Sequence, residues 1–203
     1  MILSTSMKHG GQYHFRIHQN KLDKLSENGL EPLKKYLQRV RTDCPDHYFQ
    51  KGPRSSILKI KINSELEKKE HEVKNLARMG LESGYYDNAH MNVQMFMLAY
   101  DNKTVAIEVP LWLENHEHEK YFELFKTKEP LTGHVDLIRI EDQKIWIWDY
   151  KPNAHREKYA DTQTYFYAVM LSKRTGIPLK KFMCGYFDEK NSYVFEPSRI
   201  ILQ

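Results

Sequence analysis

Residues 133–151 read GHVDLIRIEDQKIWIWDYK, and this stretch decides the fold. Its two apolar runs, 135–140 and 144–150, predict a pair of β-strands, and the polar turn between them predicts a hairpin. Asp136 then opens the first strand, and Asp149 ends the second. The hairpin is therefore expected to bring two carboxylates to one place.

Lys151 lies two residues after Asp149, so its side chain projects to the same side of the strand. Two converging carboxylates are hard oxygen ligands suited to Mg²⁺ or Mn²⁺, and the cation offsets their mutual repulsion. A lysine beside such a cation can position or deprotonate water. The combination suits hydrolysis of a phosphodiester, because the metal polarises the phosphoryl oxygen and the ammonium stabilises developing negative charge.

The acid-x-Lys pattern alone carries little information, because six such tripeptides occur in this charged chain. Only the copy at 149–151 ends an apolar strand and follows a Gly-x-x-Asp that opens the neighbouring strand. A coincidental match on an unrelated α/β domain is the plain alternative, and in that case the two carboxylates lie far apart. The sequence lacks GxxxxGK, HExxH and GxSxG patterns, so nucleotide-driven motors, zinc proteases and serine hydrolases lose their usual sequence support.

The segment after the hairpin also carries periodic patterns. Residues 159–174 predict a helix, with Gln163 and Tyr167 on its apolar face. Residues 181–188 and 192–196 predict a second strand pair.

Upstream, residues 31–41 predict a short basic helix, and 56–62 predict a strand whose wet face is cationic. A capping box predicts a helix over 64–80. Residues 92–114 favour a β-hairpin, although 93–98 fit a helix as well. The order of these elements predicts a mixed α/β or α+β domain with one central sheet flanked by helices.

The composition is that of a globular protein with one core. The chain has 203 residues, 40% of them hydrophobic and 12% aromatic, which excludes disorder as the main state. No run approaches the ~18 apolar residues of a membrane helix, and the N-terminus lacks a signal pattern, so a cytoplasmic location is expected. Cys44 and Cys184 are too few for an iron–sulfur cluster and are expected to be buried, reduced thiols.

The formal net charge of +4 is unevenly distributed. Residues 1–63 carry 12 Lys and Arg against 5 Asp and Glu, so the basic charge lies in the first third of the chain. This part predicts contacts with nucleic-acid phosphates and aromatic stacking on bases; solvated charge around core aromatics is an equal alternative. Trp146, Trp148 and Tyr150 are expected to pack in the core.

Three motifs in order resemble the PD-(D/E)xK nucleases, and within them the RecB-like exonuclease branch. They are Gly-x-x-Asp at 133–136, Asp-x-Lys at 149–151 and Gln-x-x-x-Tyr at 163–167. The resemblance covers roughly residues 105–194. It implies a restriction-endonuclease-like core within residues 56–203, preceded by a basic segment of residues 1–55 that contacts nucleic acid.

The resemblance also implies roles for single residues. Asp136 and Asp149 would hold Mg²⁺ or Mn²⁺, and Lys151 would be the catalytic lysine. Gln163 and Tyr167 would contact DNA or orient the site.

The family often adds a further metal ligand from an upstream helix. His71, within the predicted helix, is the candidate, and His90 is the alternative. Glu108 resembles an acidic strand residue that can precede the Gly-x-x-Asp motif; an edge-strand surface acid is the alternative. For nucleic-acid contacts the remaining candidates are Lys59, Lys61 and His134, although strand packing is the favoured interpretation of His134.

The leading expectation is therefore a metal-dependent DNA nuclease, an exonuclease acting in DNA repair, recombination or replication. A nucleic-acid-binding protein that keeps the fold without cleaving is the alternative. The CRISPR-associated members of the branch carry four cysteines around an iron–sulfur cluster, and two cysteines cannot supply it. The motifs leave open the choice between exonuclease and endonuclease, the preference for DNA or RNA, and the oligomeric state.

Overall fold

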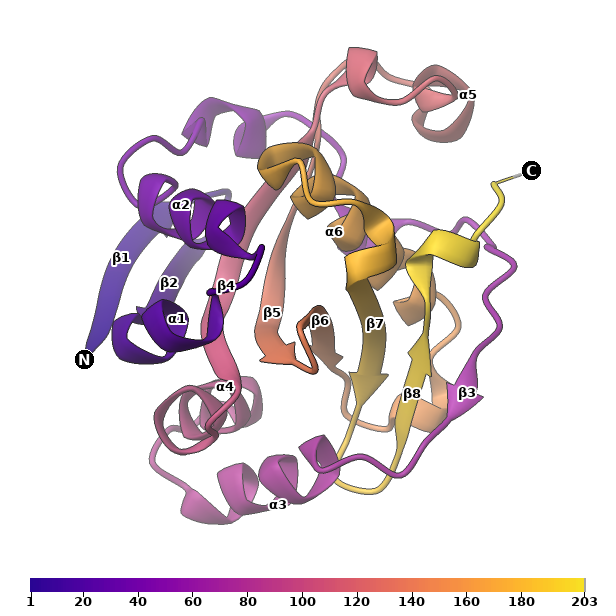
Figure 1. Cartoon of the computed structure of the whole chain (residues 1–203). Helices are drawn as coiled ribbons and strands as arrows, with labels where there is room; N and C mark the ends of the chain where they lie inside the picture. The colour runs from indigo at the N-terminus through magenta and orange to yellow at the C-terminus, as the bar shows by residue number, and fades with distance from the viewer. Residues whose placement is uncertain (203) are drawn as a thin grey trace.

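The computed structural model describes residues 1–202 and is built on one eight-stranded sheet (Figure 1). The strand order is β1-β2-β4-β5-β6-β7-β8-β3. Within residues 1–202, β6 and β7 form the only parallel pair of neighbours, and α6 makes the crossover between them. The strands are β1 (Ile2–Lys8), β2 (Gln12–His18), β3 (Glu67–Lys68), β4 (Thr104–Leu113), β5 (Leu131–Glu141), β6 (Lys144–Tyr150), β7 (Phe182–Phe187) and β8 (Ser192–Phe195).

Helices flank the sheet, which confirms the predicted α/β class with a central mixed sheet and a restriction-endonuclease-like core. None of the helices in the described part of the chain has the length and apolar character needed to cross a membrane. The α-helices are α1 (Gln19–Leu25), α2 (Glu31–Arg39), α3 (Val73–Ser83), α4 (Ala89–Tyr100), α5 (Tyr121–Phe125) and α6 (Ala160–Thr175).

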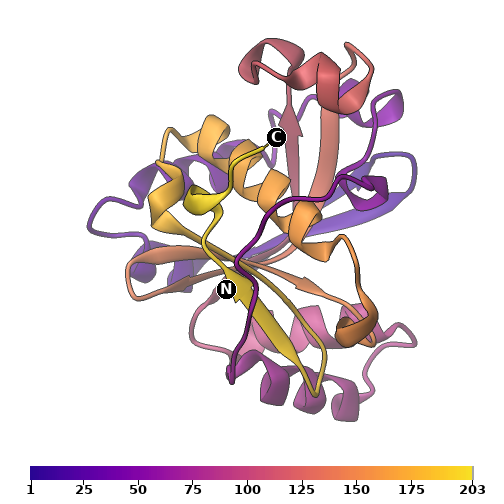
Figure 2. The same cartoon turned by 90° about the vertical axis from the view of Figure 1, so that its right-hand side faces the viewer.

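Two apolar cores lie against the sheet. The larger joins α1, α2 and α6 to it, with Phe166 of α6 fully buried. The smaller joins α3 and α4 to the sheet around Trp146 and Trp148, which are buried as predicted. Figure 2 shows α6 on one side of the sheet and α3 with α4 on the other.

The predicted hairpin of β5 and β6 is confirmed, as are α6, α2 and the β7–β8 pair. Each of these elements has a strong periodic pattern of apolar residues in its own sequence. Between β4 and β5, the excursion that carries α5 extends away from the body of the molecule (Figure 1).

The strand predicted over 56–62 is wrong. A short 3-10 helix spans Ser55–Ile57, and the following residues run extended without joining the sheet. Leu58, Ile60 and Ile62 still pack against the larger core, and the Thr162 hydroxyl of α6 donates a hydrogen bond to the Ile60 carbonyl. The alternating pattern is therefore satisfied by packing across α6 rather than by strand pairing.

The helix predicted over 64–80 is wrong in its first half. Ser64 does not cap it, because its hydroxyl donates to Asp161 Oδ2 at 2.6 Å. The next residues pair with the sheet edge as β3, and Lys69 N donates to Ser192 O at 3.0 Å. Pairing with β8 outcompetes the local helix signal, so α3 begins only at Val73.

The hairpin predicted over 92–114 is also wrong, and the alternative helix is present. Residues 89–100 form α4. Asn88 caps its N-terminus, and the Asn88 side chain accepts a hydrogen bond from Met91 N. The helix packs so closely on α3 that a Cβ at Gly80 would lie 2.9 Å from Val93 Cα. Because α4 is buried on several sides, its sequence lacks the one-sided apolar stripe that predicts a surface helix.

Residues 1–55, expected as a separate basic segment, contribute to the same sheet. Strands β1 and β2 form a hairpin whose turn contains Gly10 at φ +72°, a conformation that favours glycine. Strand β2 pairs with β4, so the sheet continues across this segment.

Candidate active site

Strands β5 and β6 separate at the two predicted metal ligands. Their pairing ends at Leu137 opposite Trp148, one residue from Asp136 on β5 and one from Asp149 on β6. The Asp136 carboxylate replaces the missing ladder bond, because its Oδ2 accepts a hydrogen bond from Tyr150 N at 2.9 Å. The end of the ladder thus opens space between the strands and fixes Asp136 at its edge.

Glu108 reaches the same place from β4 through an unusual backbone conformation. Its neighbours Ile107 and Val109 pair with Leu137 and Val135, so Glu108 lies opposite Asp136. Its φ is +51°, a left-handed value that is costly for a glutamate inside a strand. Gln94 of α4 holds the side chain, donating from Nε2 to Glu108 Oε1 at 2.7 Å.

Asp149 is buried, and its carboxylate is poorly satisfied by the protein. Lys151 Nζ lies 2.6 Å from Asp149 Oδ2, an ion-pair distance. Within residues 1–202 the Asp149 Oδ1 atom has no hydrogen-bond donor, so Lys151 offsets only one side of this carboxylate. A buried carboxylate without donors is costly unless a cation completes its surroundings.

The crowding of these acids changes their protonation. Burial, followed by the charge of Asp136, raises the pKa of Glu108 and that of Asp149 to about 7. Burial lowers the pKa of Lys151, but the Asp149 and Asp136 carboxylates outweigh it, so the net shift is upward and the amine stays an ammonium. One ammonium cannot balance three carboxylates, and the incompletely satisfied Asp149 carboxylate beside Asp136 and Glu108 suits a hard divalent cation.

A histidine adjoins this cluster, and it is His90 of α4. Its Nε2 lies 3.2 Å from Asp136 Oδ2, and its ring packs edge-on against Tyr150. Burial lowers the pKa of His90, but the hydrogen bond and charge of Asp136 outweigh it, so the pKa is raised.

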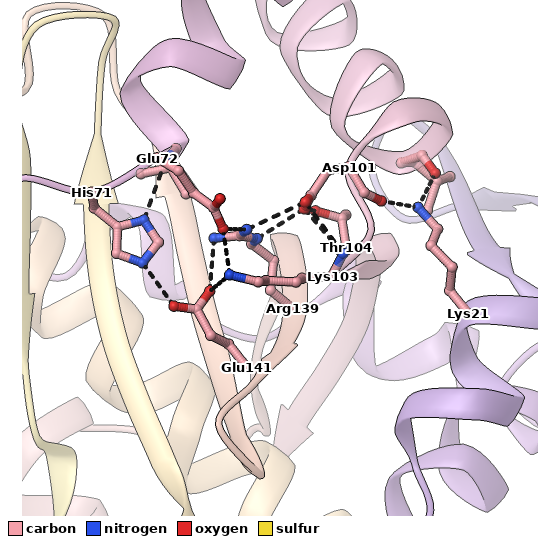
Figure 3. Close-up of polar contacts among 10 residues, drawn as sticks. Lys21, His71, Glu72, Asp101, Lys103, Thr104, Arg139 and Glu141 are labelled. Carbon is pink, nitrogen blue, oxygen red and sulfur yellow. Dashed lines mark hydrogen bonds and ion pairs between the residues drawn. The ribbon is translucent and has the colours of Figure 1, made fainter.

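The structure places His71 away from the carboxylate cluster. Its Nε2 lies 3.3 Å from Glu141 Oε1 (Figure 3). Its ring packs against Trp146 and Trp148. Glu141 is five residues along β5 from Asp136, roughly 17 Å at strand spacing. His71 therefore takes part in a separate polar network, because α3 begins after it and faces the far end of β5.

The third motif packs directly behind the acids. Gln163 Nε2 donates to the Tyr167 hydroxyl at 2.9 Å, and both side chains are buried. A Cβ at Gly133 would lie 2.3 Å from Ser55 Oγ and 2.5 Å from Tyr167 Cε1. The glycine of the Gly-x-x-Asp motif is thus the residue that lets α6 approach β5.

Gly133→Ala is expected to lower the free energy of unfolding by about 1–3 kcal/mol, because the added methyl group overpacks against Tyr167. Urea denaturation measures the change. Gly11→Ala is the matched control, since a Cβ there meets only Tyr13 Cε2 at an ordinary 3.7 Å. Equal stability of both variants would contradict this account of the glycine.

The cluster lines a pocket of about 190 Å³. Arg54 and Ser56, from the segment between α2 and β3, are not predicted as site residues, and Tyr13 of β2 is expected only among the aromatics of the basic N-terminal segment. Arg54 Nη1 donates to the Tyr13 hydroxyl at 2.6 Å. No local pattern marks them, because they reach the pocket only through the tertiary fold. The pocket is lined by Tyr13, Arg54, Ser56, Glu108, Gly133, His134, Asp136, Asp149, Lys151, Gln163 and Tyr167.

His134 both packs and borders the pocket. Its ring stacks on Tyr13 at a centroid distance of 3.7 Å, and its Nε2 lies 2.8 Å from His9 Nδ1. Burial, and then the neighbouring His9 and Arg54, lower the pKa of His134 to about 2, so the ring is neutral. A neutral imidazole can contact a phosphate only through a hydrogen bond, without charge.

The two predicted DNA-contacting lysines are both exposed. Lys59 lines a second pocket of about 540 Å³, which shares Ser56, Lys151 and Gln163 with the first. Lys61 lies two residues further along the same extended segment. The second pocket therefore forms a path that leads from Lys59 to the cluster of acids.

Comparison with known families agrees with the fold. A profile of the PD-(D/E)XK nuclease superfamily matches residues 33–199, and the chain belongs to this superfamily. No curated protein and no solved structure gives a match.

Proposed function

We propose that the chain is a metal-dependent nuclease that hydrolyses DNA phosphodiester bonds. The observation that carries the proposal is the convergence of Glu108, Asp136, Asp149 and Lys151 on one pocket. The Gln-x-x-x-Tyr pair behind them, with a histidine from an upstream helix, supports the RecB-like exonuclease branch. We further propose an exonuclease that acts in DNA repair, recombination or replication.

The residues that would hold Mg²⁺ or Mn²⁺ are Asp136, Asp149 and Glu108, with His90 beside them. When bound there, the ion would polarise the scissile phosphate and acidify a water molecule. The Asp149 Oδ1 atom, which has no donor within residues 1–202, and the raised pKa values of Asp149 and Glu108 support a cation at this place.

The protein supplies the remaining chemistry. The Lys151 ammonium can orient the attacking water and stabilise negative charge on the phosphate oxygens. Gln94 and the Tyr150 backbone N–H hold Glu108 and Asp136 in fixed orientations. Arg54, at the pocket wall, supplies positive charge on the side of the substrate.

Cleavage assays with single- and double-stranded DNA in Mg²⁺ or Mn²⁺ test the proposal. We expect linear DNA to be degraded and chelation to stop the reaction. Covalently closed circular DNA separates the two modes, since an exonuclease leaves it intact. Salt-dependent binding without metal-dependent cleavage would instead favour the non-catalytic binding protein.

His90→Ala is expected to raise the metal concentration needed for half-maximal cleavage by about 10–100-fold, because it removes a group held at Asp136. Titration of Mn²⁺ at fixed DNA concentration measures the shift. His71→Ala is the matched control, and we expect its metal requirement to match the wild type. The reverse result would restore His71 as the ligand.

Lys59→Ala is expected to weaken DNA binding similarly for all sequences and to reduce the slope of log Kd against log salt by about 0.7–0.9. Binding is measured with the metal omitted, so that cleavage does not interfere. Lys35→Ala, an exposed lysine of α2 outside both pockets, serves as control. An unchanged slope for Lys59→Ala would remove this segment from the DNA path.

A further inference from the structure

A second group of metal-binding atoms lies outside the carboxylate cluster. His9 Nε2, Cys44 Sγ and a carboxylate oxygen of Asp46 all lie within 4.8 Å of one another. His9 comes from the turn after β1, and the other two come from the loop that follows α2. We propose that these three side chains form a zinc site that joins the N-terminal hairpin to this loop.

The distances suit three ligands of one tetrahedral ion. His9 Nε2 lies 2.8 Å from Asp46 Oδ1 and 3.9 Å from Cys44 Sγ. Zinc bonds of about 2.0 Å to nitrogen or oxygen and about 2.3 Å to sulfur place tetrahedral ligands roughly 3.3–3.5 Å apart. Shifts of about half an ångström would bring both separations from His9 Nε2 to these values.

The loop is shaped so that both of its ligands face His9. Asp46 N donates to Cys44 O at 2.9 Å, which closes a tight turn around Pro45. A short 3-10 helix then begins at Asp46. Two ligands one residue apart are thereby held on one side of the loop.

The surroundings of His9 are those of an oriented metal ligand. Its ring is fully buried and stacks on Phe49 at a centroid distance of 3.8 Å. Its other nitrogen, Nδ1, lies 2.8 Å from His134 Nε2. A ligating histidine commonly uses its second ring nitrogen in such a bond, which fixes the tautomer and directs the free nitrogen at the metal.

The donor set distinguishes this site from the carboxylate cluster. One imidazole, one thiolate and one carboxylate suit Zn²⁺, whereas Mg²⁺ prefers oxygen ligands throughout. The Asp46 side chain is 60% exposed, so an ion can enter from solvent and keep water as its fourth ligand. The His9–His134 hydrogen bond links the zinc site to the pocket of the carboxylate cluster, which His134 lines. Bound zinc would therefore also restrain the His134 ring.

Cobalt titration of the Asp149→Asn protein tests the site, because Co²⁺ bound to a thiolate gives a charge-transfer band that carboxylate coordination does not give. We expect the band to saturate at about one ion per chain, and Zn²⁺ to displace it. Cys44→Ser and His9→Ala should lose the band. His47→Ala should keep it, since His47 is an exposed neighbour of Asp46 outside the group.

A measurement on the wild-type protein guards against misfolding of these variants. Zn²⁺ should slow alkylation of Cys44 several-fold, because a metal-bound thiolate is blocked, while Mg²⁺ should not. Buried Cys184 reports whether the whole fold has changed. No cobalt band, a band that survives Cys44→Ser, or equal alkylation with and without zinc would overturn the proposal. Loss of DNA cleavage in Asp149→Asn does not bear on the zinc proposal, because Asp149 is not one of the three zinc ligands.

Discussion

Asp149→Asn is expected to lower DNA cleavage by about 10³-fold and to raise the melting temperature of the metal-free protein above pH 7. The loss of activity follows because the amide removes the charge of a proposed metal ligand beside Lys151. The gain in stability follows because the same carboxylate is buried beside Asp136, and Lys151 offsets this burial and repulsion only in part. One substitution thus separates what the acid does for catalysis from what it costs the fold.

The sign of the stability change depends on the pKa of Asp149. Burial and the Asp136 charge raise that pKa from 3.8 to about 7. A group with a raised pKa in the folded state contributes its full stability below the unfolded value, and this contribution is lost as the pH rises through about 7. Above pH 7 the folded protein must hold an ionised, buried carboxylate, and asparagine removes that requirement.

Thermal melts at about pH 5 and about pH 8, with and without Mn²⁺, measure this effect. The melting temperature of metal-free wild type should fall toward pH 8, and Mn²⁺ should restore it. Asp149→Asn should reduce both the fall and the response to Mn²⁺.

Two further variants separate catalysis from folding. Lys151→Met should also lose cleavage but should melt lower, because it leaves Asp149 without its nearest cation. Asp142→Asn, in the exposed β5–β6 turn, should change neither property. Cleavage by Asp149→Asn within a few-fold of wild type would exclude Asp149 as a metal ligand.

The part of the site that could be predicted from sequence lies on one short stretch and the next helix. Strands β5 and β6 follow each other directly, so strand alternation and a short turn suffice to bring Asp136 near Asp149. The spacing of Gln163 and Tyr167 on α6 is equally local. Such features depend on periodicity, which a single sequence displays.

The remaining site residues depend on distant pairing. Glu108 points into the pocket because its φ is left-handed, and a glutamate in the sequence gives no indication of such a conformation. His90 reaches Asp136 because α4 packs beside β4. The capping box that favours His71 predicts a helix over residues that instead pair with β8. The N-terminal hairpin has a weaker local signal, which consists of the alternation in β2 around Phe15 and the glycines at its turn.

The network around Arg139 carries the largest predicted effect on stability. Arg139 is fully buried in β5, with Nε 2.9 Å from Asp101 Oδ2 and Nη2 bonded to Glu72 (Figure 3). Its Nη1 lies 3.2 Å from Glu141 Oε2. The guanidinium thereby joins the start of α3 and the end of α4 to the sheet. Because α4 also carries His90, the network helps to set the position of that residue at the active site.

Arg139→Met is expected to lower the free energy of unfolding by about 3–5 kcal/mol, because Asp101 and Glu141 would stay buried without their main cation. Denaturant unfolding measures the loss. Lys103→Met is the matched control, since Lys103 pairs with the same Glu72 but is 38% exposed, and we expect it to cost at most about 1 kcal/mol. Similar losses in the two variants would show that burial of the guanidinium is not what stabilises the network.

The acid side of the unfolding curve gives an independent check on the same network. The His71 hydrogen bond and the Arg139 charge lower the pKa of Glu141 to about 2, against the opposing effect of burial. A carboxyl with a lowered pKa contributes stability above its unfolded value of 4.5, and this contribution is lost as the pH falls through about 2. Without Arg139 the pKa of Glu141 rises, so Arg139→Met should unfold at higher pH than wild type in an acid titration. His71→Ala should shift the acid transition in the same direction while leaving DNA cleavage at neutral pH unchanged, because His71 acts on Glu141 and not on the carboxylate cluster.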